Sequence, residues 1–356
     1  MTTAGKPMLL TGNHAVAWGA RLARPQVLPV YPITPQTPIL ELLTEFHARG
    51  ELDAEILTPE SEHSVMAACI PASLAGVRVF TATASQGLML MHEMLHYASG
   101  ARAPIVMANV NRTVASPWAF WPDQTDSLAQ RDTGWVQLYS ESAQESLDTV
   151  IQAFRIAERV LLPVMVNHDA FYVSHALEAV LLPSQALVDE YLPAYAPEHF
   201  LDPERGESWG NVVSQDMYYR HRQDIGEAMA AVPAVATAAD EQWCESTGRG
   251  YGLIERYRCE DARLVIVTMG SMCGTVRDAV DTLRDRGDAV GLLKLRLFRP
   301  LPVEALRAAL YGMLGAPRVH GYLAGVGGVN VPPEKILEFV ARVSAHNPVP
   351  ASVWVR

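Results

Sequence analysis

Cysteine is scarce in this 356-residue sequence, and its few copies are not clustered. No C-x-x-C pair occurs among the four, which are Cys69, Cys244, Cys259 and Cys273. Zinc ribbons and cysteine-ligated iron–sulfur clusters depend on closely spaced cysteines. The sequence therefore predicts neither kind of metal centre in this chain. We expect reduced, mostly buried thiols of the kind found in cytoplasmic proteins.

Basic runs and long apolar runs are absent as well. The formal net charge is −11 at pH 7, and no stripe of lysine and arginine stands out. Because binding to nucleic acid needs a cationic surface, that class of partner is not expected. No apolar segment is long enough to span a bilayer, and the first residues do not resemble a signal peptide. We therefore expect a cytoplasmic protein with no membrane partner.

The composition is otherwise that of a globular protein, with 49% hydrophobic and 19% charged residues, and the length favours two domains. Short apolar segments predict strands at 27–31, 54–57, 77–83, 104–110, 135–139 and 162–167. Helical patterns predict helices at 8–24, 39–43, 65–75, 88–95 and 143–160. This alternation predicts an α/β fold with an open, mostly parallel sheet that is covered on both faces.

The pattern weakens between 182 and 250, where prolines are frequent and only a helix over 214–231 is expected. A second, smaller α/β pattern follows, with strands at 264–270 and 290–296 and helices at 276–286 and 303–310. We therefore predict three segments. They are a first domain over 1–235 with a long excursion at 182–235, a linker over 236–258, and a second domain over 259–356.

Three polar segments follow predicted strands of the first domain. They are Tyr31-Pro32-Ile33-Thr34-Pro35, Thr58-Pro59-Glu60-Ser61-Glu62-His63-Ser64, and Asn111-Arg112. In an open parallel sheet, the loops at the carboxyl ends of the strands converge on one crevice. We therefore expect a hydroxyl, a carboxylate and a guanidinium to meet at one place.

Each of these residues also has an ordinary structural interpretation. Glu62 can be a solvated carboxylate stabilised by a helix N-terminus, and Thr34 can cap a turn. A lone arginine is usually a surface residue, although the planar fork of Arg112 would suit a carboxylate at the end of a buried strand. Glu60 and Glu62 are two residues apart and do not share a helix face, so a coupled pair of carboxylates is not expected.

Taken together and in this order, the three segments resemble the α subunit of the 2-oxoacid:acceptor oxidoreductases, which are thiamine-diphosphate enzymes of the pyruvate:ferredoxin oxidoreductase type. The resemblance covers most of residues 8–180 and about 250–300, and includes further matches at 132–138, 251–255, 270–275 and 296–300. It implies a pyrimidine-binding α/β domain followed by a smaller transketolase-C-like α/β domain. The C-terminal part departs from the family after Leu310, and the run at 325–330 stands where relatives end in G-R-D.

The resemblance also implies roles for particular residues. Glu62 would contact N1′ of the cofactor's aminopyrimidine, and burial would favour sharing a proton with it. The Thr34 hydroxyl would hydrogen-bond the carboxylate or oxo group of the substrate, and Arg112 would bind the carboxylate. Asp123 would order the loop over 121–126, which resembles the family's W-x-D-x-x-D.

Trp118 and Phe120 depart from the smaller residues expected in pyruvate-specific relatives. They can pack under their loop or against a neighbouring subunit. Alternatively, they line an apolar pocket for a larger substrate, such as an aryl 2-oxo acid, because aromatic side chains pair favourably with aromatic guests. The sequence leaves both interpretations open.

A thiamine-diphosphate site also needs a G-D-G…N segment to hold Mg²⁺ and the diphosphate, and Gly287-Asp288-Ala289 is not such a segment. The resemblance thus implies that this chain supplies only the pyrimidine half of the site and is inactive alone. A β subunit would carry the diphosphate and Mg²⁺ motif. Iron–sulfur subunits would pass electrons to ferredoxin or NAD. The complex would convert a 2-oxo acid and CoA to acyl-CoA and CO₂, with pyruvate or an aryl acid such as phenylglyoxylate as substrate.

Two alternatives remain at this point. His92-Glu93-Met94-Leu95-His96 has the H-E-x-x-H spacing of zinc metalloproteases, in which both histidines face one way on a helix. No third ligand is evident downstream, so we expect no metal bound by this chain. The other alternative is a non-catalytic scaffold subunit that keeps the fold without the site.

Overall fold

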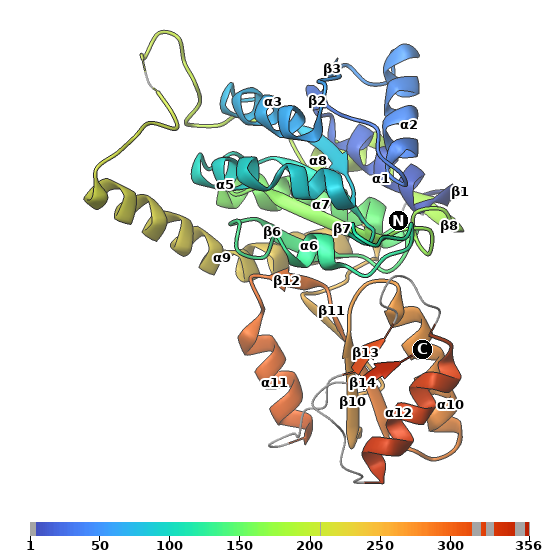
Figure 1. Cartoon of the computed structure of the whole chain (residues 1–356). Helices are drawn as coiled ribbons and strands as arrows, with labels where there is room; N and C mark the ends of the chain where they lie inside the picture. Colours follow the sequence, from blue (N-terminus) through green and yellow to red (C-terminus); the bar gives the residue numbers. More distant parts are fainter. Residues whose placement is uncertain (1–4, 207, 315–321, 325–330, 346–352, 356) are drawn as a thin grey trace.

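A computed structural model of the chain describes residues 5–206, 208–314, 322–324, 331–345 and 353–355. Figure 1 shows a larger α/β unit, coloured blue to green, above a smaller one in orange and red. The main sheet of the larger unit is mostly parallel and lies between helices. The predicted α/β class is therefore confirmed. The run at 325–330, where the sequence departs from the family, lies outside the described residues.

The larger unit alternates strands and helices as the sequence predicts. Its elements up to residue 169 are β1 (Lys6–Thr11), α1 (Gly12–Ala23), β2 (Val27–Pro29), α2 (Thr37–Ala48), β3 (Glu55–Leu57), α3 (Glu62–Leu74), β4 (Phe80–Thr83), α4 (Ser85–Leu90), α5 (His92–Gly100), β5 (Val106–Asn111), α6 (Thr125–Leu128), β6 (Val136–Tyr139), α7 (Ala143–Val160) and β7 (Val164–Asp169). It continues with β8 (Leu177–Leu182), α8 (Gln185–Tyr191) and α9 (Gln215–Thr247).

The central sheet has the order β12-β6-β7-β5-β4, in which β4, β5, β6 and β7 run parallel. The parallel pair β2–β3 joins the same arrangement through a bridge between Val27 and Val79. The polar segments that follow β2, β3, β4 and β5 therefore all leave the sheet at the carboxyl ends of parallel strands. This topology places the candidate residues on one edge of the fold.

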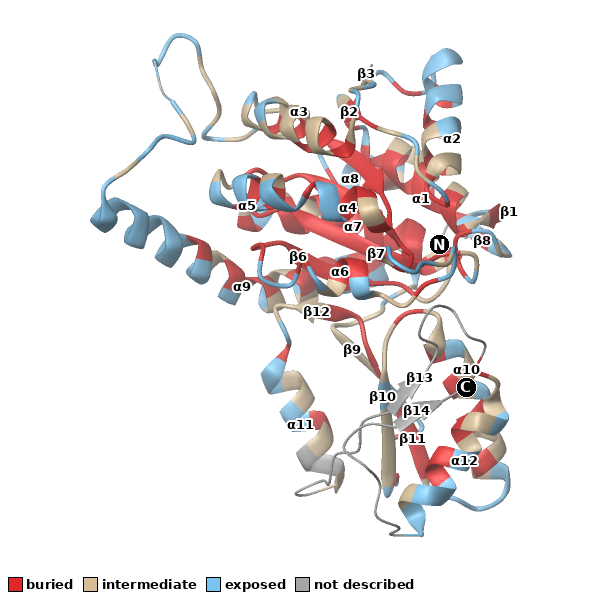
Figure 2. Ribbon diagram, viewed as in Figure 1, coloured by how far each residue is buried: buried red, intermediate tan, exposed pale blue. Residues whose placement is uncertain are grey.

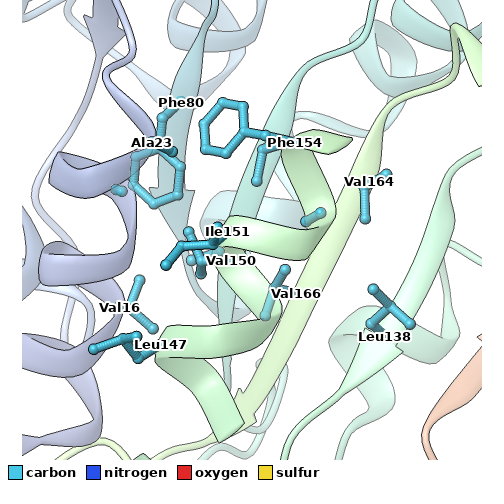
Figure 3. Close-up of a cluster of buried hydrophobic side chains, with 14 of the residues drawn as sticks. Val16, Ala23, Phe80, Leu138, Leu147, Val150, Ile151, Phe154, Val164 and Val166 are labelled. Carbon is cyan, nitrogen blue, oxygen red and sulfur yellow. The ribbon is translucent and has the colours of Figure 1, made fainter. Parts of the chain in front are cut away.

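The core of the larger unit lies between the sheet and helices α1 and α7. Every residue of β5, β6 and β7 is buried, as expected for parallel strands covered on both faces. Figure 3 shows Val16 of α1, Leu147 and Ile151 of α7, and Val166 of β7 meeting in this core. A Cβ on Gly19 would lie 2.7 Å from the carbonyl oxygen of Leu147, so the close contact of α1 with α7 requires glycine there.

Three sequence-based elements need correction. The helix expected over 8–24 begins only at Gly12, because the preceding residues form β1 and pair with the distant strand β8. The helix expected over 88–95 is two helices, α4 and α5, which meet at Met91. The helix expected over 214–231 extends to Thr247 through Pro233, and Figure 2 shows its N-terminal half projecting with mostly exposed residues.

The smaller unit consists of β9 (Ile254–Tyr257), β10 (Leu264–Thr268), α10 (Met272–Asp285), β11 (Val290–Leu295), β12 (Leu297–Arg299), α11 (Val303–Leu314), β13 (Tyr322–Ala324), α12 (Pro333–Ser344) and β14 (Val353–Val355). β10 pairs parallel with β11, and β9 pairs antiparallel with β11. β13 pairs with β14. β12 leaves this unit and joins the central sheet beside β6.

Buried charges join the two units. Nζ of Lys294 lies 2.7 Å from Oε2 of Glu145 on α7, and both side chains are buried. Arg296 donates to Oε1 of Gln152, also on α7, at 2.8 Å. Because α9 runs across residue 235, the predicted linker begins inside a helix. The division at 235 and 258 stays a proposal. In the part of the chain that the structure covers, no helix is both long and apolar enough to cross a membrane.

Candidate active site

The structure brings two of the three predicted strand-end segments into direct contact. Nη1 of Arg112, which follows β5, donates to the backbone carbonyl of Thr34, which follows β2, at 2.5 Å. Burial lowers the pKa of Arg112, and the nearby carboxylates of Asp126 and Glu62 oppose this lowering. Glu62 begins α3. The carboxylate, the guanidinium and the Thr34 loop thus share one region.

Glu62 is buried, with 8% of its surface exposed, whereas Glu60 is exposed. Ser61 caps α3 by accepting a hydrogen bond from the backbone N–H of Ser64 at 3.3 Å. The Ser64 hydroxyl in turn donates to Glu60 at 2.5 Å, and this bond holds the pKa of the Glu60 carboxyl below its usual value. Of the two acids, only Glu62 therefore turns into the protein.

Gly87 on α4 forms one wall beside Glu62. A Cβ at this position would lie 2.6 Å from Oε1 of Glu62 and 2.5 Å from Oγ1 of Thr83. The Thr83 hydroxyl is buried and has no hydrogen-bond partner among the described residues. A buried hydroxyl without a partner is uncommon. Together with a bare glycine and a buried carboxylate, it fits a polar heteroaromatic ring placed against this wall.

Arg112 is held on several sides. Its Nη2 donates to Oε1 of Gln86, while Nε is buried and finds no partner within the described segments. The guanidinium carbon lies 4.9 Å from the ring centre of Trp118 and 6.0 Å from that of Phe120. This cation–π contact fixes the plane of the guanidinium. The free Nε–H leaves capacity for an anion.

Trp118 and Phe120 stand beside Arg112. Their rings meet edge to face at 5.0 Å, and they are 49% and 41% exposed. Thr113 closes the base of this loop, because its hydroxyl donates to the Ala119 carbonyl at 2.7 Å and accepts from the Ala119 N–H at 2.6 Å. The two aromatic faces are therefore presented to the outside next to the guanidinium.

The side chains of Thr34 and Asp123 lie differently from what the sequence predicts. Thr34 is exposed and reaches Arg112 through its carbonyl rather than through its hydroxyl. Asp123 accepts hydrogen bonds from the backbone N–H and the hydroxyl of Thr125, at 3.0 and 2.5 Å. It thereby caps the start of α6 locally and, in these contacts, does not reach Arg112 or Glu62.

Sequence reasoning missed Asp126, three residues further on. Asp126 is fully buried, and its Oδ2 accepts the backbone N–H groups of Ser85 and Arg112 at 3.0 and 3.1 Å. Burial raises the pKa of this carboxyl to about 6, although hydrogen bonds from four donors oppose the rise. The only sequence signal was its place as the second acid of W-x-D-x-x-D. Nothing in that spacing distinguishes a buried acid from an exposed one.

A buried polar network also escaped prediction. The Asn109 amide donates to Asn111 at 2.9 Å and to Asn167 at 3.1 Å, and Asn111 donates to Asp169 at 3.4 Å. Asp169 accepts the backbone N–H and the hydroxyl of Ser271 in the smaller unit at 2.8 and 2.7 Å. These residues lie on adjacent strands of the central sheet, so the smaller unit docks on the same strand ends that carry the site.

The H-E-x-x-H segment does not assemble a metal centre. Nδ1 of His92 is within 2.6 Å of Oε1 of Gln130, and the His92 and His96 rings lie 5.1 Å apart at an angle of 87°. Across the described residues, no group of three or more His, Cys, Asp and Glu side chains is arranged to hold a metal ion. The spacing on a helix is present, but a third ligand is not found there.

Comparison with known proteins identifies the family of the chain and its fold. A family profile described as pyruvate flavodoxin/ferredoxin oxidoreductase, thiamine-diphosphate-binding, matches residues 18–241. A second, described as pyruvate:ferredoxin oxidoreductase core domain II, matches residues 262–317. The fold is similar to that of a solved 2-oxoglutarate:ferredoxin oxidoreductase from Magnetococcus marinus, with a TM-score of 0.76 at 20% identity. This match covers 95% of this chain and 65% of that one.

Two curated relatives are much closer in sequence. The pyruvate synthase subunit PorA of Methanothermobacter thermautotrophicus is 46% identical over 98% of this chain and 97% of its own length. The ketoisovalerate oxidoreductase subunit VorA of Pyrococcus horikoshii is 50% identical over 84% of this chain and 76% of its own length. The resemblance inferred from the sequence is thereby confirmed, and the chain belongs to the family of α subunits of 2-oxoacid:ferredoxin oxidoreductases.

Proposed function

We propose that this chain is the α subunit of a complex that oxidatively decarboxylates a 2-oxo acid with CoA to acyl-CoA and CO₂. The observation that carries the proposal is the buried Glu62 carboxylate, which lies against Gly87 and the unpartnered Thr83 hydroxyl. The names of the relatives, pyruvate synthase and ketoisovalerate oxidoreductase, support a 2-oxo acid as substrate.

Thiamine diphosphate fits this arrangement. When bound, it supplies a nucleophilic carbon that attacks the 2-oxo carbon and accepts the electron pair left by CO₂. Glu62 would hold a proton at N1′ of the aminopyrimidine, because its carboxylate is buried and has only restricted access to water. Gly87 lets the Glu62 carboxylate and Thr83 lie together against its Cα, and Thr83 offers a hydroxyl that lacks a partner in the described structure.

Arg112 would bind the carboxylate of the substrate. Its Nε–H lacks a partner among the described residues, and its aromatic neighbours hold the planar guanidinium in one orientation. A planar guanidinium suits a carboxylate. The exposed Thr34 hydroxyl lies on the residue whose carbonyl Arg112 contacts, so it can bond the same substrate group. Asp123 would act only indirectly, by ordering the start of α6.

Trp118 and Phe120 would set the size and polarity of the substrate. Their exposed faces stand beside Arg112, where the side chain of a bound 2-oxo acid would project. The names of the two relatives refer to aliphatic 2-oxo acids, pyruvate and ketoisovalerate. The aromatic pair extends the proposal to an aryl acid such as phenylglyoxylate, since aromatic contacts contribute about 0.5–1.5 kcal/mol each.

The rest of the reaction would lie on other chains. A β subunit would hold the diphosphate and Mg²⁺, because this sequence has no G-D-G…N segment. Iron–sulfur subunits would carry the electrons to ferredoxin or NAD, because no C-x-x-C occurs here. All four cysteines are free thiols, which is in keeping with a cytoplasmic location.

The complex purified from the native cell tests the proposal. We expect cluster-bearing chains to accompany this one. We also expect acyl-CoA to form only when a 2-oxo acid, CoA, thiamine diphosphate and an electron acceptor such as ferredoxin or NAD are all present. Purification without such chains, together with no turnover after their addition, would contradict it. Stoichiometric zinc on this chain would favour the metalloprotease alternative. Turnover that is unchanged in the Glu62→Gln variant of the complex would favour a non-catalytic scaffold subunit.

A further inference from the structure

A single carboxylate oxygen ties together two loops that line the candidate site. Oδ2 of Asp126 accepts the backbone N–H of Ser85, after β4, and that of Arg112, after β5, at 3.0 and 3.1 Å. Oδ1 of the same side chain accepts the N–H of Ser127 at 2.8 Å. The backbones of both strand-end loops are thus hydrogen-bonded to the same side chain on α6.

The Ser85 anchor controls the wall beside Glu62. Ser85 has a φ of 46°, in the left-handed region that a serine adopts only when its surroundings hold it there. Its hydroxyl donates to the carbonyl of Thr113, which closes the next loop. Gly87, two residues after Ser85, is the residue that packs against Glu62. Loss of the Ser85 anchor would therefore shift this wall.

We propose that Asp126 is a positioning residue, whose carboxylate sets the spacing between the Gly87 wall of Glu62 and the Arg112 guanidinium. This inference rests on the proposed function. Asp126 does not touch the substrate or the cofactor in this assignment. It acts through the backbone of Ser85 and Arg112, so its removal displaces the two groups that do.

The ionised carboxylate is the form that suits this role. The groups that hydrogen-bond to it are donors, namely the N–H groups of Ser85, Arg112 and Ser127 and, at 3.4 Å, the amide of Asn109. A protonated acid or an asparagine would turn its own hydrogen toward one of these donors. Asp126→Asn therefore loosens one side of the junction while it keeps the volume of the side chain.

Asp240 provides a matched control. It is also buried, and its Oδ2 likewise accepts two backbone N–H groups, those of Tyr251 and Gly252, at 2.8 and 2.7 Å. It lies on α9, where it contacts neither Glu62 nor Arg112. Its Oδ1 also accepts from Gln152 at 3.2 Å and pairs with Arg296 at 3.4 Å. Asp240→Asn therefore removes a buried carboxylate with at least as many partners at a place away from Glu62 and Arg112.

The experiment compares wild type, Asp126→Asn and Asp240→Asn in the assembled complex. Amide hydrogen exchange is followed by mass spectrometry in peptides that cover 84–90 and 111–117. We expect faster exchange in both peptides for Asp126→Asn and in neither for Asp240→Asn. Steady-state kinetics should show kcat lower by about 10- to 100-fold, the usual effect of a displacement near 1 Å. KM for the 2-oxo acid should rise, because Arg112 moves as well.

The kinetic parameters separate positioning from simple instability. A variant that only unfolds loses active enzyme and keeps the KM of wild type, and this result for Asp126→Asn would overturn the inference. Unchanged exchange in the two peptides would also overturn it. In that case, turnover by the wild-type complex would still leave the proposed function standing. Absence of turnover in the complete wild-type complex would instead contradict the proposed function, and the inference with it.

Discussion

Gly87 lies directly against Glu62, so closely that a methyl group on its Cα would come within 2.6 Å of the carboxylate oxygen Oε1. The same methyl group would come within 2.5 Å of the Thr83 hydroxyl. Neither neighbour is the end of a long exposed side chain, and both are buried. The absence of a side chain at position 87 is therefore a condition for the geometry of the site.

Gly87→Ala should weaken the binding of thiamine diphosphate by the assembled complex by about tenfold or more, since overpacking costs typically about 1–3 kcal/mol. Gly226→Ala on the projecting part of α9 is the control, because nothing lies within 4 Å of a Cβ there. Titration of the cofactor into both variants measures the effect. Equal affinities would mean that the wall at Gly87 does not border the cofactor.

Glu62→Gln should reduce turnover by at least about 100-fold, because the amide cannot share a proton with the pyrimidine. The variant should assemble normally, since the side chain keeps its shape. Glu60→Gln changes an exposed acid two residues earlier and should retain the activity of wild type. The rate of acyl-CoA formation distinguishes the two, and similar losses in both variants would show that burial of Glu62 has no special role.

Arg112→Lys should raise KM for the 2-oxo acid by about 10- to 100-fold, because hydrogen bonds to charged groups contribute about 1.5–3 kcal/mol. A lysine cannot contact Thr34 and Gln86 in one plane and still offer an N–H to the substrate. Arg131→Lys, on an exposed side chain beyond α6, is the control. A KM equal to that of wild type would remove Arg112 from substrate binding.

Trp118→Ala should change which substrates the complex prefers more than it changes the overall rate. If the aromatic pair receives an aryl acid, kcat/KM for phenylglyoxylate should fall by about tenfold relative to that for pyruvate. Competition between the two acids in one assay measures this ratio. A ratio that stays constant would indicate that Trp118 packs against a neighbouring subunit instead.

Asp126 should affect stability and activity in opposite directions as pH changes. Burial raises its pKa to about 6 in the folded protein, whereas an unfolded aspartic acid titrates near about 3.9. The folded state therefore binds the extra proton between these values, and the free energy of unfolding falls as pH rises through this window. Arg112 faces the carboxyl as a cation, and Tyr139, whose pKa is raised by burial, faces it as a neutral phenol.

The measurement is the difference in thermal midpoint between wild type and Asp126→Asn from about pH 4 to pH 7. Wild type should lose stability relative to the variant as pH rises toward about 6, while its activity increases over the same range because the ionised carboxylate holds the loops. A difference that does not depend on pH would show that Asp126 does not titrate there.

Much of the fold follows from local patterns. Apolar runs with flanking turn residues located the strands of the central sheet, and the helical pattern over 143–160 located α7 with the bounds that the structure shows. β1 was missed because its partner, β8, lies more than 160 residues away in the sequence. The buried cations Lys294 and Arg296 were missed for the same reason, since their partners are on α7.

The site was predictable only in part. The convergence of Glu62 and Arg112 follows from parallel topology, which the alternation of strands and helices already indicates. The roles of Gly87 and Asp126 depend on which side chains turn inward after a strand ends, and a spacing of residues does not contain that information. The contact of Thr34 through its carbonyl likewise depends on the path of the backbone, not on the type of residue.

The most direct test is a structure of the assembled complex with thiamine diphosphate bound. We predict that a carboxylate oxygen of Glu62 lies within hydrogen-bond distance, about 3.2 Å or less, of N1′ of the aminopyrimidine. We also predict that Gly87 and Thr83 border the same ring. A structure in which Glu62 points into bulk water, or in which the pyrimidine binds elsewhere, would contradict this account.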